Sequence, residues 1–129
     1  MREVLVGLGL AFATCISLVL LPVEWARDAI ANLLTLIAAI YVGFSLASQG
    51  RLALTKQVAG CLFFVTLALL GLWVNWWFLV AGLALHGGWD FLHHGEYGHG
   101  VVPHWYVPFC AVYDWAVALF VAVRYATAS

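Results

Sequence analysis

The sequence predicts an all-α integral membrane protein, a single domain over residues 1–129 built as a bundle of five transmembrane helices. Hydrophobic residues make up 66% of the chain and charged residues only 9%, whereas a soluble domain is about half apolar and about a quarter charged. The mean hydropathy is +1.03. Four or five membrane helices of about 20 residues each account for most of the 129 residues, so little of the chain remains for a soluble domain. Four helices with one re-entrant or tilted segment are the alternative.

The first predicted helix covers residues 4–21 and ends at Pro22. Its apolar run is longer than the hydrophobic region of a signal peptide, and the following "PVEW" lacks the small residues of a cleavage site. We therefore expect a retained membrane helix. The second helix is expected to start after "EWARD", with Asp28 as its N-cap, and to end near Ser48.

The remaining helices follow from the breaks in one long apolar stretch. The polar loop "QGRLALTKQ" precedes a third helix over residues 58–73. The segment "WVNWW" is typical of the headgroup layer, where tryptophan is enriched, so we expect a break there. A fourth helix then covers residues 76–94, and a fifth covers residues 105–125 after the loop "GEYGHGVVP".

The basic residues give a small bias in orientation. With five crossings, Arg2, Arg51 and Lys56 fall on one side and Arg27 and Arg124 on the other. Lysine and arginine concentrate in cytoplasmic loops, so three against two predicts a cytoplasmic N-terminus in a bacterial inner membrane. The lipid bilayer is the expected partner, with other membrane protein subunits or further copies of the chain beside it.

Charge and cysteine content exclude some classes of function. The net charge of −1 offers no basic surface, so nucleic acid is not an expected partner. The three cysteines, Cys15, Cys61 and Cys110, each lie inside an apolar segment and form no CxxC pair. They are expected to be packing residues rather than a disulfide framework.

The stretch "HGGWDFLHH", residues 86–94, holds most of the ionisable groups of the fourth helix. All five histidines of the chain lie between positions 86 and 104. On a helix, the spacing of His86, Asp90, His93 and His94 places them within one sector of about 100°. A charged side chain at the bilayer centre costs about 2.5–3.5 kcal/mol, so this face is expected to turn toward protein.

Metal coordination is the chemistry that uses such a set. Imidazole and carboxylate groups are ligands of zinc, iron and copper, and a histidine and an aspartate one helical turn apart present two ligands on one face. The sequence therefore predicts a transition metal site. The predicted ligands are His86, Asp90, His93 and His94, and the predicted peripheral or supporting residues are His99, His104, Tyr113 and Asp114.

A different interpretation of the same residues is structural. Buried His and Asp side chains can serve as hydrogen-bonding contacts between membrane helices, each worth less than about 2 kcal/mol. His99 and His104 have no helical spacing to a partner, and the headgroup layer accommodates such residues at low cost. Asp114 is then a partner for a histidine of the fourth helix. Both interpretations stay open on the sequence alone.

Two resemblances bear on function. "DFLHH", residues 90–94, resembles the HxxHH box of membrane fatty-acid desaturases and hydroxylases, with aspartate as the first residue. Those enzymes use about eight histidines to hold two irons, and this chain has five. Over about its last 60 residues the chain is also similar to small uncharacterised bacterial multi-pass membrane proteins. That similarity, in "HGxWDxxHH" and "WYxPFCxxYD", implies that the two stretches act as a unit.

Three functions are compatible with these features. The first is a small membrane metalloprotein whose metal is structural or supports oxidation or hydrolysis, and whether it is an enzyme stays open. The second is a non-enzymatic accessory or assembly subunit that packs against a larger membrane complex. The third is a proton or metal-ion conduit, which is disfavoured because few polar groups continue beyond Asn75.

Overall fold

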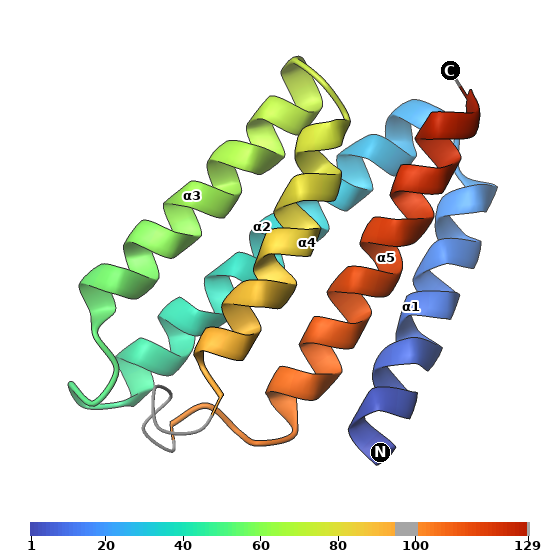
Figure 1. The fold of residues 1–129 in the computed structure, drawn as a ribbon. Helices are drawn as coiled ribbons and strands as arrows, with labels where there is room; N and C mark the ends of the chain where they lie inside the picture. The colour runs from blue at the N-terminus through green and yellow to red at the C-terminus, as the bar shows by residue number, and fades with distance from the viewer. Residues whose placement is uncertain (95–100, 129) are drawn as a thin grey trace.

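The fold is a bundle of five α-helices within the residues that the computed structural model describes, which are 1–94 and 101–128 (Figure 1). The helices are α1 Arg2–Leu20, α2 Val23–Ala47, α3 Leu54–Trp73, α4 Trp77–Leu92 and α5 Tyr106–Ala128. Four of them, α1, α2, α3 and α5, are long and apolar enough to cross a membrane. The predicted class of helical membrane protein with five helices is confirmed.

The chain runs up and down the bundle, so that the N-terminus and the connections after α2 and α4 lie at one end (Figure 1). We call this end the lower face. The C-terminus and the α1–α2 and α3–α4 connections lie at the opposite end. Helix α4 packs between α3 and α5, α2 packs mainly against α3, and α1 packs mainly against α5.

Helix α4 is too short to cross a bilayer on its own. Its 16 residues span about 24 Å at 1.5 Å per residue, against a hydrocarbon core of about 30 Å. The helix ends at Leu92, two residues before the predicted end, and the C-cap residue His93 has left helical geometry with φ −100° and ψ 10°. His93 and His94 therefore do not continue the helical face that carries His86 and Asp90.

The starts of α2 and α3 differ from the prediction. Helix α2 begins at Val23, directly after Pro22, so Asp28 is not its N-cap. Ala26 donates its backbone N–H to the Pro22 carbonyl at 2.9 Å and is fully buried. The helix thus starts as soon as the proline permits, although Val23, Glu24 and Trp25 in its first turn are exposed. Similarly, α3 begins at Leu54, four residues early, and buries the polar Gln57.

The predicted break in the aromatic segment is confirmed. Helix α3 ends at Trp73 and α4 begins at Trp77. Between them, the Asn75 side-chain carbonyl accepts the backbone N–H of Trp77 at 2.9 Å. Asn75 therefore satisfies one of the free N–H groups at the start of α4, which explains an asparagine at this tight turn.

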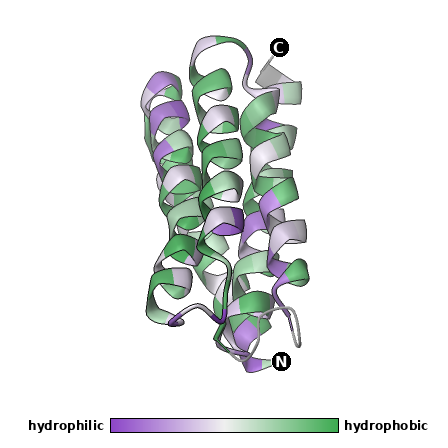
Figure 2. Ribbon diagram, turned by 90° about the vertical axis from the view of Figure 1, so that its left-hand side faces the viewer, coloured by the Kyte–Doolittle hydropathy of each residue, from purple (hydrophilic) through white to green (hydrophobic). Residues whose placement is uncertain are grey.

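Most of the bundle surface is apolar. Hydrophobic residues dominate the ribbon over most of its length, with polar residues gathered toward its ends and at isolated points (Figure 2). Side chains such as Phe12, Leu36 and Leu119 are about two-thirds exposed. In water such a surface would aggregate, whereas in a bilayer it is solvated by lipid, so the outer faces fit a membrane protein.

Two glycines allow α4 to approach its neighbours closely. A side chain at Gly87 would collide with the indole of Trp115 in α5, and a Cβ at Gly60 in α3 would lie 2.6 Å from the Trp89 ring. The Trp115 indole N–H donates to the Ala84 carbonyl of α4 at 3.0 Å. These contacts fix the rotation of α4 and turn its polar residues toward α5.

Candidate metal centre

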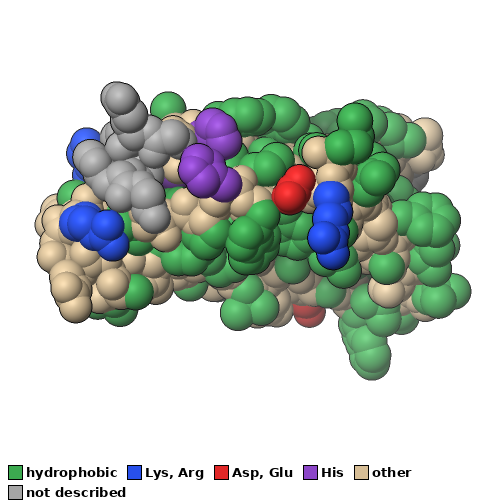
Figure 3. Space-filling view, turned by 90° about the horizontal axis from the view of Figure 1, so that it is seen from below, with side chains coloured by type: hydrophobic (Ala, Val, Ile, Leu, Met, Phe, Trp, Pro, Cys, Tyr) green, Lys and Arg blue, Asp and Glu red, His purple; other side chains and the backbone are tan. Residues whose placement is uncertain are grey.

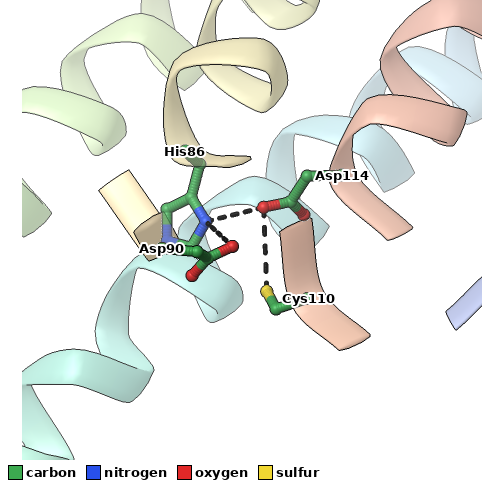
Figure 4. A group of neighbouring side chains, drawn as sticks. All are labelled: His86, Asp90, Cys110 and Asp114. Carbon is green, nitrogen blue, oxygen red and sulfur yellow. Dashed lines mark hydrogen bonds and ion pairs between the residues drawn. The ribbon is translucent and has the colours of Figure 1, made fainter. Parts of the chain in front are cut away.

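Four polar side chains meet between α4 and α5 in the middle of the bundle (Figure 4). His86 and Asp90 come from α4, and Cys110 and Asp114 come from α5. Each pair is spaced i, i+4, so its two side chains lie one turn apart on the same helix face. Asp114 lies eight residues after the start of α5 at Tyr106, or about 12 Å along the helix. The cluster therefore lies deep within the apolar part of the structure.

The four side chains are close enough to interact directly. His86 Nδ1 lies 2.7 Å from Asp114 Oδ2 and 3.7 Å from Asp90 Oδ2. The Cys110 thiol donates a long hydrogen bond to the same Asp114 oxygen, with Sγ 3.7 Å away. The short contact between His86 and Asp114 needs one proton between the two atoms, carried either by His86 Nδ1 or by the Asp114 carboxyl group.

The cluster is sealed from the surroundings but not fully satisfied. His86, Asp90 and Asp114 are each 0% exposed. Yet His86 Nε2, Asp90 Oδ2 and Asp114 Oδ1 have no hydrogen-bond partner within the described part of the chain. Nearly all buried polar atoms in proteins are paired, and two ionised carboxylates beside one imidazole would leave negative charge uncompensated. A cation bound by the carboxylates of Asp90 and Asp114 would compensate this charge.

One further residue supports the cluster from α2. Tyr41, which is buried, donates its hydroxyl to Asp90 Oδ1 at 2.7 Å. This hydrogen bond fixes the orientation of the Asp90 carboxyl group and leaves Oδ2 directed toward His86. Tyr41 thus positions a candidate ligand, and its ring also lies beside that of His86, with centroids 6.0 Å apart.

The donor set is able to hold a metal ion. One ligand atom from each of His86, Asp90, Cys110 and Asp114 lies within 4.8 Å of all the others. Four donors of imidazole, thiolate and carboxylate type are those of tetrahedral zinc sites, and they also suit iron.

His93, which was predicted as a ligand, occupies a separate environment. It is buried, and its Nε2 lies 2.9 Å from Gln57 Nε2 in α3. Its Nδ1 lies 2.9 Å from the Trp89 carbonyl, which can only accept, so Nδ1 carries the proton. The Tyr41 ring packs between the two sites, with its centroid 4.3 Å from that of His93 and 6.0 Å from that of His86.

The other predicted residues lie away from the cluster. His94 and His104 are exposed near the lower face, with ring centroids 6.0 Å apart, and Figure 3 shows histidine side chains on this face. Tyr113 faces α1, where its hydroxyl lies 2.8 Å from the Thr14 hydroxyl. His99 falls outside the described residues. Of the eight predicted site residues, the structure brings His86, Asp90 and Asp114 together.

Two members of the site were not predicted from the sequence. Cys110 was expected to be a packing residue, although its i, i+4 spacing to Asp114 repeats the spacing of His86 and Asp90. Two such pairs on consecutive helices are a signal that could have indicated the site. Tyr41 carries no such signal, because its contact with Asp90 spans 49 positions.

A comparison with protein families identifies relatives across nearly the whole chain. A family model described as "Family of unknown function (DUF6010)" matches residues 2–128. The chain belongs to the DUF6010 family. Comparisons with curated proteins and with solved structures found no significant match. The family covers all five helices, so α4 and α5 with their polar residues are part of one family unit.

Proposed function

We propose that this protein is a small membrane metalloprotein that binds one transition metal ion between α4 and α5. The ligands are His86, Asp90, Cys110 and Asp114. The observation that carries the proposal is that one donor atom from each of these four buried side chains lies within 4.8 Å of all the others. In addition, Asp90 Oδ2 and Asp114 Oδ1 have no hydrogen-bond partner among the described residues. A divalent cation would provide the positive charge that two buried carboxyl groups require.

The donor types favour zinc or iron(II) as the ion. A thiolate and an imidazole are soft to intermediate donors, which disfavours magnesium and calcium, whereas the two carboxylates are harder than the ligands that copper(I) selects. Iron and zinc both accept this mixture of nitrogen, oxygen and sulfur. Between them, four protein donors match the coordination number of a structural zinc site.

The proposed role of the ion is to fasten α4 to α5. Helix α4 spans only 16 residues, and hydrophobic burial does not drive helices together in lipid. Two ligands from each helix would join them directly at mid-depth in the bundle. A redox or hydrolytic reaction would instead require a coordination position for a water molecule or a substrate, either in place of one protein ligand or beside the four.

Cobalt(II) substitution tests the proposal, because a cobalt–thiolate bond gives an intense near-ultraviolet charge-transfer band. Detergent-purified protein without a histidine tag is loaded with cobalt(II), and its spectrum is compared with that of Cys110→Ser. We expect the band in the wild type and its loss in Cys110→Ser. The matched controls are Cys15→Ser and Cys61→Ser, which change the two other free cysteines and should retain the band. An identical spectrum in Cys110→Ser would contradict the proposal.

A further inference from the structure

Tyr106, the first residue of α5, carries a buried hydroxyl group that has no role among the four proposed ligands. The residue is 4% exposed, and its hydroxyl has no hydrogen-bond partner among residues 1–94 and 101–128. Burying a hydroxyl group without a partner destabilises the folded state, because the group gives up its hydrogen bonds with water. Nearly all buried polar groups in proteins are paired, so this hydroxyl requires a physical explanation.

The Tyr106 side chain lies beside the sulfur donor of the candidate metal centre. Tyr106, Cys110 and Asp114 are spaced i, i+4 and i+8, so they share one face of α5. Tyr106 and Cys110 belong to one group of packed, buried side chains. Tyr106 interacts electrostatically with Cys110 and, more weakly, with Asp90 of α4. The hydroxyl is therefore at the edge of the cluster, on the side of Cys110.

Two aromatic rings of α2 pack against the Tyr106 ring. Its centroid lies 5.6 Å from that of Tyr41 and 5.2 Å from that of Phe44, and both contacts are edge-to-face. Edge-to-face contacts are a favourable arrangement of aromatic pairs. The ring is thus held by a helix other than its own, which restrains the hydroxyl from moving away from Cys110.

The chemical form of Cys110 determines what it offers to this hydroxyl. As a thiol, Cys110 donates its proton toward Asp114 Oδ2, with Sγ 3.7 Å away, and a thiol sulfur is only a weak acceptor. A cysteine that binds a metal does so as a thiolate. Hydrogen bonds to an ionised acceptor are about twice as strong as those between neutral groups. Metal coordination would therefore turn Cys110 into a good acceptor for Tyr106.

We propose that Tyr106 donates a hydrogen bond to the sulfur of Cys110 when this cysteine is a metal-bound thiolate, and that it thereby strengthens metal binding. Tyr106 is a positioning residue, because it acts on a ligand and does not touch the ion. The inference rests on the proposed function, since it requires Cys110 to be a ligand. Its role differs from that of Tyr41, whose hydroxyl is already bonded to Asp90 at 2.7 Å.

Tyr106→Phe tests the proposal, because it removes the hydroxyl and keeps the ring. In the presence of a chelator, the variant should be as stable as the wild type or more stable, since the change removes an unpaired buried group and breaks no hydrogen bond. Its cobalt(II) affinity should nevertheless fall, and residues that hydrogen-bond to metal ligands typically contribute about 10–100-fold. Circular dichroism gives the thermal midpoint, and a cobalt titration gives the affinity.

The cobalt spectrum provides a readout that a purely structural role would not change. A hydrogen bond to the thiolate lowers the energy of the sulfur lone pairs, so its loss should move the cobalt–thiolate charge-transfer band to longer wavelength. The matched control is Tyr125→Phe, whose hydroxyl is also buried and unpartnered within the described residues but lies near the other end of α5. It should leave both the affinity and the band unchanged.

The possible failures can be told apart. A wild-type band with an unchanged affinity and band position in Tyr106→Phe would overturn the inference and leave the proposed function intact. The absence of a cobalt–thiolate band from the wild type would overturn both. If Tyr106→Phe were less stable than the wild type in chelator, as we expect for Tyr41→Phe, the hydroxyl would already be paired without a metal, which would also contradict the inference.

Discussion

Replacing Asp114 by asparagine tests the metal centre most finely, because the change keeps the shape of the side chain and removes its charge. Asp114 Oδ2 lies 2.7 Å from His86 Nδ1, and the carboxyl group is fully buried. Even a carboxylate that only orients a ligating histidine typically contributes about 10–100-fold to metal affinity. As a direct ligand, Asp114 should contribute at least this much.

The expected effect can be expressed as metal-dependent stability. A metal present at 100 times its dissociation constant stabilises the folded state by about 2.7 kcal/mol. If Asp114→Asn weakens binding about 100-fold, the same metal concentration stabilises the variant by only about 0.4 kcal/mol. Metal binding should therefore raise the thermal midpoint of the wild type and hardly change that of the variant.

The assay is thermal unfolding in detergent, followed by circular dichroism with zinc or with a chelator present. Asp28→Asn is the matched control, because Asp28 is an exposed aspartate on α2, and it should respond to zinc as the wild type does. The reasoning is refuted if Asp114→Asn keeps the full zinc-dependent stabilisation, or if zinc does not stabilise the wild type.

Three further predictions concern packing, hydrogen bonding and protons. Gly87→Ala should destabilise the protein by about 1–3 kcal/mol in a denaturant titration, because its methyl group collides with Trp115. The adjacent Gly88→Ala should cost nothing, since that site is open, and equal losses would contradict the close approach of α4 and α5. Tyr41→Phe should cost about 1–3 kcal/mol by leaving Asp90 Oδ1 without its donor, and an unchanged unfolding midpoint would exclude that hydrogen bond. Metal affinity should rise with pH, because thiol and imidazole ligands lose protons on binding, and weakly buffered protein should release acid on zinc addition. A pH-independent affinity would contradict this proton release.

The helical architecture could be predicted because its signals are local. Long apolar runs interrupted by Pro22 and by the "WVNWW" segment fixed the number of helices and the α3–α4 break. The helix starts were predicted less well. The polar residues before Val58 and around Asp28 indicated loops, but burial of Gln57 and Ala26 extends both helices. Tertiary packing therefore outweighed local polarity at these two ends.

The candidate site could be predicted only in part. His86 and Asp90 share a face of α4 as the helical spacing indicated, but the same spacing placed His93 and His94 on that face. The helix ends at Leu92, so the periodicity did not apply to them. Cys110 faces the cluster because of the way α5 is rotated about its axis relative to α4. This rotation depends on contacts between the helices, such as that of Trp115 with Gly87. Contacts between two helices cannot be predicted from the spacing of residues along one helix.

The most direct test of the central claim is elemental analysis by plasma mass spectrometry. Protein purified without a histidine tag is compared with a His86→Ala/Cys110→Ala double variant and with a His94→Ala/His104→Ala control, in which both histidines are exposed. The metal-centre proposal predicts close to one zinc or iron per chain in the wild type and the control, and loss of that metal in the first variant. The absence of metal from wild-type protein, or equal metal in all three, would contradict it.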